Sequence, residues 1–534
     1  MKRIEIGAAV MLAGLLTFSA SEAQTGAKAN TRGRIFETNV TNNLNIASGE
    51  PEIAIDPRDP RNLAIIEFAL GSAEVPAWSL NPLMDVRGEK QAAASMRYTG
   101  RVMLSRDGGN TWAARPAPAY DSTRSPGGGD PMIAYGPDGS LYAADEPLPN
   151  PAQRAHMYEY RFVIAVSTDG GTTFSKPQQV PTPVDRPWLT VDQSTGIVYT
   201  ASTGLLNPRT GAHNRQVKGA ITDRWLTVWR PHLSAHSRPR RMGGPDFSAG
   251  MGNTMTAANG VIASTFVLGS LTFEGGPPSK GPTPIPDSLR PLVKDGVRSC
   301  SLTALCLFFQ TSSDQGRTWT RHYVPVAGGF SGFFTYVSAD PGFPGRYAVG
   351  VLNRDATGFR VLLTDDSGGT WSKPIAVPQV APAAAPTTAA GESPFDIMNR
   401  GTILKPWMAY GPSGVLGVMW KQRRDDLLGS AKLSGVPGRS VGPGFDVYAA
   451  ISCDGGTTWL RPVKVDAEPS PAGPSSFDDL SYIALDTHYA HLVWGDRRDI
   501  AKVKNTATGI GGVQAYYGRV PFSLVSHGAQ CGRR

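Results

Sequence analysis

Cysteine and histidine are scarce in this chain, which has four cysteines and eight histidines among 534 residues. The histidines are dispersed. The closest pair, His488 and His491, lies in an alternating strand-like run and lacks the spacing of a zinc-binding helix. No motif identifies a cofactor. The sequence therefore predicts neither a structural metal site nor a cofactor.

Long apolar runs are missing beyond the N-terminus, so no membrane span is predicted. Residues 1–23 combine two basic residues, Lys2 and Arg3, with an apolar stretch and the small-residue ending Ser21-Glu22-Ala23. This pattern is typical of a secretory signal peptide. We therefore expect a secreted or periplasmic protein whose mature part, residues 24–534, is a single domain.

A strong excess of charge is also absent, since 52 Lys and Arg residues against 44 Asp and Glu residues leave a net charge of +8. So mild an excess is typical of a solvated surface, although it also suits the binding of an acidic glycan. No nucleic-acid-binding motif occurs. The sequence predicts no nucleic-acid partner, and we expect a monomer.

One eight-residue pattern, Ser/Thr-x-Asp-x-Gly-x-Thr/Gly-aromatic or close to it, occurs five times. Its copies are SRDGGNTW (105–112), STDGGTTF (167–174), SSDQGRTW (312–319), TDDSGGTW (364–371) and SCDGGTTW (452–459). Ser and Asp side chains can bond nearby backbone N–H groups, glycine supplies a positive φ, and the aromatic residue opens the next strand. The pattern predicts the same hairpin turn five times, formed by Asp107, Asp169, Asp314, Asp366 and Asp454.

This pattern resembles the Asp-box, or BNR repeat, of sialidases and related propeller proteins. The resemblance covers most of residues 35–530. It implies a β-propeller in which the five aspartates are structural and lie far from the catalytic end. It also implies a glycosidase, although the Arg-Ile-Pro tripeptide usual in sialidases is replaced here by Arg34-Ile35-Phe36.

A second repeat consists of an apolar strand, an Asp/Gly/Pro turn and another apolar strand. Five clear copies and two weaker ones occupy residues 50–69, 130–145, 185–202, 252–267, 334–352, 405–421 and 480–496. Seven hairpins predict an all-β propeller with seven four-stranded antiparallel blades, and six blades is the alternative. We expect residues 34–40 to complete the last blade and close the ring. Loop insertions are expected near 204–248, 272–298, 376–400 and 424–445.

Export would permit disulfide bonds, and four cysteines allow three pairings. The spacing favours Cys300 with Cys306, which leaves Cys453 with Cys531. The second bond would tie the C-terminal tail to a blade.

Charged residues occur before the first strand or after the second strand of most hairpins. In a propeller these positions meet at one end of the ring. Arginines there could bind a carboxylate, and a carboxylic acid could protonate a leaving oxygen. The predicted substrate-binding residues are Arg186, Arg354, Arg423, Arg497 and Lys405, and the predicted acid/base residues are Asp130, Asp185, Glu50 and Asp478. Tyr482 could assist if the resemblance to sialidases extends to their tyrosine nucleophile.

The same residues have a structural interpretation, because an acidic residue before proline caps turns and Asp-Arg pairs form salt bridges between blades. Three function classes therefore remain. The first is a glycoside hydrolase for an acidic glycan. The second is a lyase for uronate polysaccharides, and the third is a non-catalytic propeller that binds a glycan or a protein.

Overall fold

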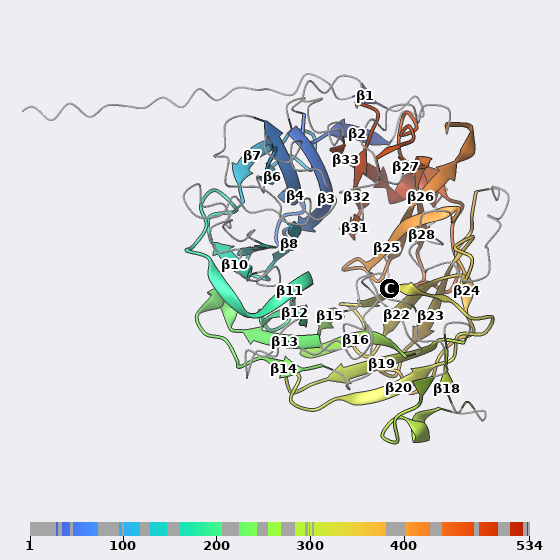
Figure 1. Cartoon of the computed structure of the whole chain (residues 1–534). Coiled ribbons are helices and arrows are strands. Elements are labelled where there is room, and N and C mark those ends of the chain that lie inside the picture. The colour runs from blue at the N-terminus through green and yellow to red at the C-terminus, as the bar shows by residue number, and fades with distance from the viewer. Residues whose placement is uncertain are drawn as a thin grey trace, which may run out of the picture.

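The computed structural model describes residues 28–29, 35–42, 46–72, 96–98, 101–117, 129–146, 161–204, 224–242, 255–268, 283–293, 297, 299–301, 304–380, 401–427, 441–474, 480–499, 513–526 and 531. These residues form a ring of seven blades, each a four-stranded antiparallel sheet, so the seven-bladed prediction is confirmed (Figure 1). The predicted signal peptide lies outside the described residues. Within them, no helix has the length and apolar character needed to cross a membrane.

The first three blades follow one another along the chain. Blade 1 contains β3 (Ile46–Ile55), β4 (Leu63–Ser72), β6 (Arg101–Ser105) and β7 (Ala113–Pro116), with β5 (Met96–Tyr98) also paired to β4. Blade 2 contains β8 (Gly129–Tyr135), β9 (Leu141–Glu146), β10 (Arg161–Ser167) and the first half of β11 (Gln178–Val191). Blade 3 contains the second half of β11, then β12 (Val198–Gly204), β13 (Arg224–Trp229) and β14 (Arg240–Arg241). The last two strands lie within residues 204–248, near which a loop insertion was expected.

The next three blades have the same order. Blade 4 contains β15 (Met255–Ala258), β16 (Val261–Leu268), β19 (Cys306–Ser312) and β20 (Thr320–Val324). Blade 5 contains β21 (Ser331–Ala339), β22 (Tyr347–Leu352), β23 (Phe359–Thr364) and β24 (Ile375–Ala376). Blade 6 contains β25 (Ile403–Tyr410), β26 (Leu416–Arg424), β28 (Gly444–Ser452) and β29 (Val463–Lys464). Two short pairs, β17 (Thr283–Pro284) with β18 (Ser299–Cys300) and β27 (Val441–Gly442) with β30 (Gly473–Pro474), accompany blades 4 and 6.

Blade 7 joins the two ends of the chain. It contains β31 (Ser481–Leu485), β32 (Tyr489–Asp496) and β33 (Gln514–Pro521), and its outer strand is the N-terminal β2 (Phe36–Asn39). β2 pairs antiparallel with β33, from Phe36 opposite Arg519 to Asn39 opposite Tyr516. β1 (Lys28–Ala29) pairs with β2, and α4 (Phe522–Val525) follows β33. The N-terminal strand therefore closes the ring as predicted, which pairs the edge that β33 would otherwise expose.

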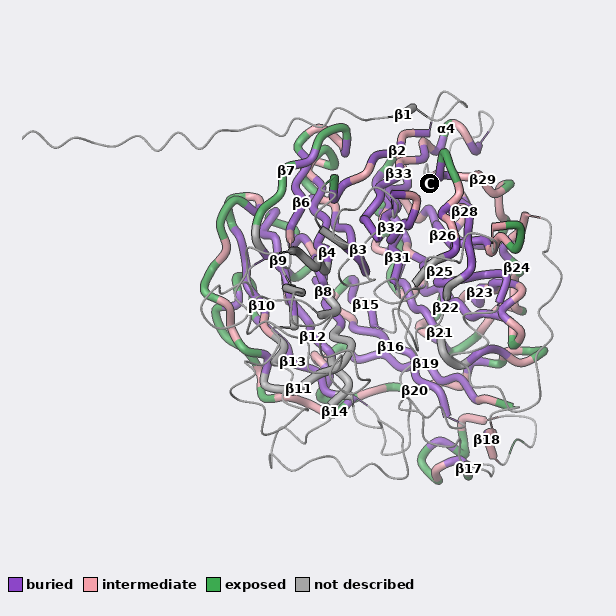
Figure 2. The backbone as a smooth tube through the Cα atoms, turned by 45° about the horizontal axis from the view of Figure 1, so that its top comes forward, coloured by how far each residue is buried: buried purple, intermediate pink, exposed green. Residues whose placement is uncertain are grey.

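The core consists of apolar layers between neighbouring blades. Between blades 1 and 2, for example, Ala54 and Ile66 pack with Ile133 and Tyr135. Most strand residues are buried and exposed residues are concentrated in the turns (Figure 2). Near-continuous apolar strands are required because each blade is covered on both faces.

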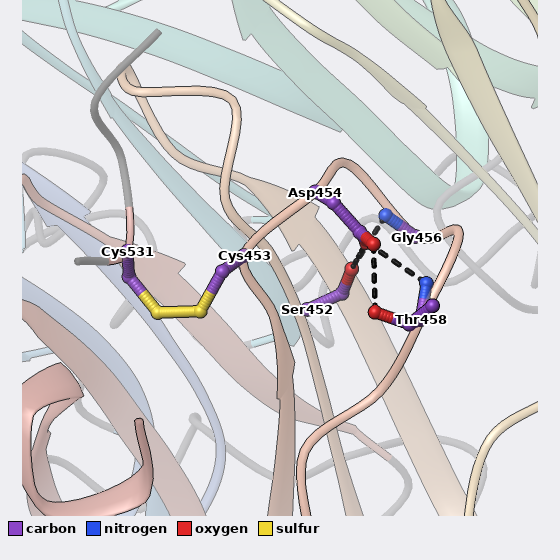
Figure 3. The surroundings of a disulfide bond; sticks show 6 residues. All are labelled: Ser452, Cys453, Asp454, Gly456, Thr458 and Cys531. Atoms are coloured by element: carbon purple, nitrogen blue, oxygen red, sulfur yellow. Dashed lines mark hydrogen bonds between the residues drawn. A yellow bond between two sulfur atoms is a disulfide. The ribbon is translucent and has the colours of Figure 1, made fainter. Parts of the chain in front are cut away.

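The five repeated turns have the same hydrogen bonds. In the blade 6 turn, the Ser452 hydroxyl donates to Asp454 Oδ1 (2.8 Å) and accepts the Gly456 N–H (2.6 Å), as Figure 3 shows. The Thr458 N–H and hydroxyl donate to the two oxygens of Asp454 at 2.8 and 2.6 Å. Asp107, Asp169, Asp314 and Asp366 accept the equivalent bonds. The predicted turn is thus formed five times, with each aspartate holding it.

Replacing Asp454 with alanine is expected to lower the free energy of unfolding by roughly 1–2 kcal/mol, because the turn loses its shared acceptor. Burial opposes ionisation of Asp454, but the hydrogen bonds from Thr458 and Ser452 outweigh it and hold its pKa below the ordinary value. The loss should therefore be complete near neutral pH and shrink as the pH falls below about 4. Urea unfolding at pH 7 and pH 3 measures both effects. The control is Asp287→Ala, which removes a carboxylate from an exposed site. An equal loss of unfolding free energy in the two variants would contradict the stabilising role of the turn.

Both predicted disulfide bonds are present. Cys300 bonds Cys306 at the start of β19, and Cys453 in the blade 6 turn bonds Cys531, beyond blade 7 (Figure 3). The second bond attaches the chain that follows blade 7 to blade 6.

Candidate functional site

One end of the ring collects the predicted site residues. In each blade the inner strand begins, the second strand ends and the third strand begins at the same end; in blade 1, for instance, Glu67 pairs with Arg101 there. We call this end the mouth. The five aspartate turns follow the third strands and therefore lie at the opposite end.

Five inner strands carry a β-bulge near the mouth. The register shifts lie between residues 49 and 52, 129 and 132, 185 and 188, 331 and 335, and 404 and 407. Four of these bulges contain a charged residue followed by proline: Glu50-Pro51, Asp130-Pro131, Arg186-Pro187 and Lys405-Pro406. Proline cannot donate to the strand ladder, so it is accommodated where pairing is interrupted. We call Glu50, Asp130, Arg186 and Lys405 the bulge residues.

Two bulge residues have a strained backbone. Glu50 has φ 47° and Lys405 has φ 48°, although each precedes proline, which favours an extended conformation. A positive φ costs a residue with a side chain about 1–2 kcal/mol, and such strain is concentrated at functional sites. Both residues are only 7% exposed. The fold thus holds one acidic and one basic residue at equivalent strained positions of blades 1 and 6.

The other predicted carboxylate-binding residues, Arg354, Arg423 and Arg497, lie at the mouth end of blades 5 to 7. Arg497 is buried; its Nη1 donates to the Pro443 carbonyl (3.2 Å) and its guanidinium lies 5.6 Å from the Phe445 ring centre. Lys421 Nζ is 4.7 Å from the same ring, and Lys421 pairs with Leu404, beside Lys405. The structure therefore brings Lys405, Lys421 and Arg497 to neighbouring positions.

Other predicted residues are less concentrated. Arg423 Nε pairs with Asp425 Oδ1 at 2.6 Å, and Arg354 is exposed in the turn between β22 and β23. The backbone places Asp130 in β8 and both Asp185 and Arg186 in β11, at the bulges. For these three residues the structure describes only the backbone. Asp478 lies outside the described residues.

Three carboxylates near the mouth belong to buried polar networks. Glu67 accepts hydrogen bonds from the Thr41 and Ser48 hydroxyls at 2.9 and 2.8 Å and lies 3.4 Å from Arg101. Asp496 and Glu37 both pair with Arg498. These groups match the structural interpretation, because they fasten the N-terminal segment to blades 1 and 7.

A layer of large side chains fills the hub of the ring below the bulges. Each lies three residues before the end of its inner strand. The members of this hub plug are Glu52, Met132, Trp188, Met255, Tyr336, Trp407 and Tyr482, and none is more than 8% exposed. Trp188 and Trp407 come from blades 3 and 6, yet their ring centres are 6.0 Å apart, so these side chains meet across the axis.

Tyr482, the predicted nucleophile, lies in this plug. Its ring centre is 3.9 Å from that of Trp407, and its hydroxyl donates to Met132 Sδ at 3.6 Å. These contacts give Tyr482 a packing role in the hub.

Glu52 is a candidate that the sequence analysis missed. One carboxyl oxygen accepts the backbone N–H of Ile133, in blade 2, at 2.9 Å. Burial raises the pKa of Glu52 well above its ordinary value, and this hydrogen bond only partly opposes the shift. Aligning the hairpins at their Pro residues would have revealed it, because Met132, Trp188 and Trp407 occupy the same position after proline.

A small pocket lies at the opposite end of the ring. It is lined by residues of blades 5 and 6, including Arg346, Asp340 and Asp454. Arg346 pairs there with Asp340 (3.5 Å) and Asp365 (2.7 Å). Among the described residues, no three His, Cys, Asp or Glu side chains cluster so as to hold a metal ion.

No protein-family model matches the chain, and no curated protein is similar to it in sequence. Among solved structures, a Hadza microbial sialidase matches at 13% identity with a TM-score of 0.42, over 81% of this chain and 76% of the sialidase. A Dyadobacter fermentans protein of unknown function matches at 13% identity and a TM-score of 0.42, over 90% and 96%. An α-L-arabinofuranosidase from Fusarium graminearum matches at 11% identity and a TM-score of 0.40, over 91% and 98%. Similarity at this level does not identify a substrate or a reaction.

Proposed function

We propose that this protein is an exported propeller that binds an acidic glycan at the mouth and hydrolyses it. The observation that carries the proposal is the set of charged bulge residues of both signs, two of them held with a positive φ. Backbone strain that packing alone does not require is expected where side chains must be presented to a ligand. Two disulfide bonds are in keeping with an oxidising, secreted or periplasmic location.

The bulge residues supply the two kinds of group that this reaction needs. Lys405 and Arg186 would bind the carboxylate of the sugar, with Arg497, Arg423 and Arg354 as further cations of the mouth. Hydrolysis also requires a carboxylate that activates water or attacks the sugar, together with an acid that protonates the leaving oxygen. Glu50, Asp130, Asp185 and Asp478 are the proposed source of the carboxylate.

We further propose that the five aspartate turns are Asp-boxes of the sialidase type with a structural role. Their hydrogen bonds are internal to each turn, and they lie at the end of the ring opposite the mouth. Substitutions there should change stability and leave glycan binding unaltered.

A panel of sialosides and uronate polysaccharides tests the function with two readouts. A hydrolase releases reducing sugar without new ultraviolet absorbance, whereas a lyase creates an absorbing unsaturated uronate. Retention of a glycan with neither product would indicate a binding protein. Absence of both reaction and retention across the panel would refute the proposed function.

Replacing Lys405 with methionine is expected to raise KM for an acidic glycan by about 10- to 100-fold, because a charge-assisted hydrogen bond is lost. Binding of a neutral glycan of similar size should change little. The control is Arg115→Met, which removes the same charge from the exposed outer strand β7 of blade 1. Equal values of KM for wild type and Lys405→Met would remove Lys405 from the site.

A further inference from the structure

The hub plug contains a single carboxyl group among its described members. Met132, Trp188, Tyr336, Trp407 and Tyr482 show that large apolar or aromatic side chains fill this position in other blades. Packing therefore does not require a glutamate at position 52. A carboxyl group kept in such surroundings costs stability, so its presence points to a chemical use.

Glu52 lacks the partners that would keep a buried carboxylate ionised. Within the described part of the chain, its one hydrogen bond is with the Ile133 N–H at 2.9 Å, and no ion pair holds it. A backbone N–H can hydrogen-bond with either the protonated or the ionised carboxyl group, whereas a buried negative charge is normally stabilised by a neighbouring cation. Burial raises the pKa of Glu52 well above its ordinary value and so favours the protonated form of this side chain.

Glu52 lies near the mouth end of the inner strand of blade 1. It lies two residues beyond Glu50 on β3, immediately below the bulge, and it is 8% exposed. The strand β3 therefore carries two carboxyl groups, that of Glu50 in the bulge and that of Glu52 in the hub plug below it. Glycoside hydrolysis uses two such groups, one protonated and one ionised.

We propose that Glu52 is the catalytic acid that protonates the leaving glycosidic oxygen at the mouth. This assignment rests on the proposed hydrolase function and extends it to a residue of the hub. As the C–O bond breaks, its electron pair goes to the oxygen and the proton of Glu52 is transferred to it. The hydroxyl of a water molecule adds to the anomeric carbon while a bulge carboxylate accepts the other proton of that water. Exchange with solvent then returns both carboxyl groups to their starting states.

Glu52→Gln and Glu52→Met test the assignment with the full-length protein. For a glycan with an alkoxide leaving group, kcat should fall about 100- to 10,000-fold in both variants, with KM nearly unchanged. For an aryl glycoside with an acidic phenol leaving group the fall should be much smaller, because such a group departs without protonation. The fall of kcat at high pH in wild type should also disappear. Met132→Leu changes the same layer without removing an acid and should retain wild-type kcat.

Stability supplies a readout that does not depend on catalysis. The pKa of Glu52 is raised in the folded state above its unfolded value of about 4.3, so wild type loses stability as the pH rises from there toward the folded value. Glu52→Gln has no proton to lose and should gain stability over wild type as the pH increases. This variant is therefore expected to fold.

The outcomes separate the two proposals. Absence of hydrolysis by wild type across the glycan panel would refute the proposed function and with it the acid role. Hydrolysis by wild type with unchanged kcat in Glu52→Gln would refute the role of Glu52 alone. An equal loss of kcat for alkoxide and phenol leaving groups would also refute proton donation by Glu52. A stability difference that does not change with pH would show that Glu52 is not held neutral, and would overturn the inference.

Discussion

Replacing Arg498 with methionine is expected to lower the free energy of unfolding by about 3–5 kcal/mol, because two buried carboxylates lose their cation. Arg498 Nη2 lies 2.8 Å from Glu37 Oε1 and 2.8 Å from Asp496 Oδ2. Glu37 is 4% exposed and Asp496 is fully buried. Glu37 belongs to the closing strand β2, so this cluster ties the N-terminal strand to blade 7.

The loss should depend on pH in a defined direction. Burial opposes ionisation of Asp496, yet Arg498 outweighs it and keeps the pKa of Asp496 below its ordinary value, whereas burial keeps the pKa of Glu37 raised. Without Arg498, burial raises the pKa of both groups above their unfolded values of about 4. The variant should then lose stability as the pH rises from about 4, so its deficit should be larger at pH 7 than at pH 4.

Urea unfolding of wild type and Arg498→Met at both pH values measures this effect. Adding Glu37→Gln and Asp496→Asn to Arg498→Met should restore part of the stability at pH 7, since no charge is then left without a partner. Arg290→Met breaks an exposed pair, whose side chains are 63% and 91% exposed, and should change stability very little. A deficit below 1 kcal/mol at pH 7, or one equal at the two pH values, would contradict the role of Arg498 in closure.

The ring could be predicted from the sequence because its repeated parts are determined by local interactions. The turn around Asp454 needs only Ser452, Gly456 and Thr458, all within six residues, and the pattern is therefore visible in a short window. The seven hairpins also have local signals. Closure by β2 was predicted from a different fact: the last hairpin unit has three strands and one strand-like run remained at the N-terminus.

Blade 3 was harder to predict, since its outer strands lack the aspartate turn. Its outer hairpin was expected near residues 221–229, where β13 lies, whereas β14 falls in a stretch expected to be a loop. Trp229 is fixed by a hydrogen bond to Thr200 in the adjacent strand, 29 residues away. β11 serves both blade 2 and blade 3, which no local pattern indicates. Pairing between distant strands decides these elements.

Sequence reasoning selected the mouth residues from the expected ends of the strands, and it did not reach the hub below them. Glu50 and Lys405 were selected because each comes just before an apolar strand run, and the structure places both in β-bulges within the inner strands. Glu52 was missed because its surroundings come from other blades: Ile133 binds it, and contacts such as Trp188 with Trp407 close the hub. Tyr482 was selected from the family resemblance, whereas its place in the plug follows from the same long-range packing.

Replacing Gly109 with alanine is the second substitution for which a large loss is expected, about 2–5 kcal/mol of unfolding free energy. Gly109 has φ +88°, which strains any residue with a side chain, and a Cβ there would overlap the ring and hydroxyl of Tyr517. Tyr517 belongs to β33, and its ring packs on Trp112 with centres 5.1 Å apart. Its hydroxyl bonds His491 Nδ1 at 2.8 Å, so the ring is not free to move aside. The substitution therefore pushes blade 1 away from blade 7.

Gly329→Ala separates backbone strain from the clash at this contact. Gly329 has φ +70°, but a Cβ there would meet no atom within 4 Å. That control should lose only the roughly 1–2 kcal/mol of the strained backbone. Urea unfolding followed by tryptophan fluorescence should place the midpoint of Gly109→Ala clearly below that of Gly329→Ala. The excess loss at Gly109 is expected because Tyr517 has no space to retreat. Coincident midpoints would therefore mean that Tyr517 moves aside easily, and would contradict a rigid contact between the first and last blades.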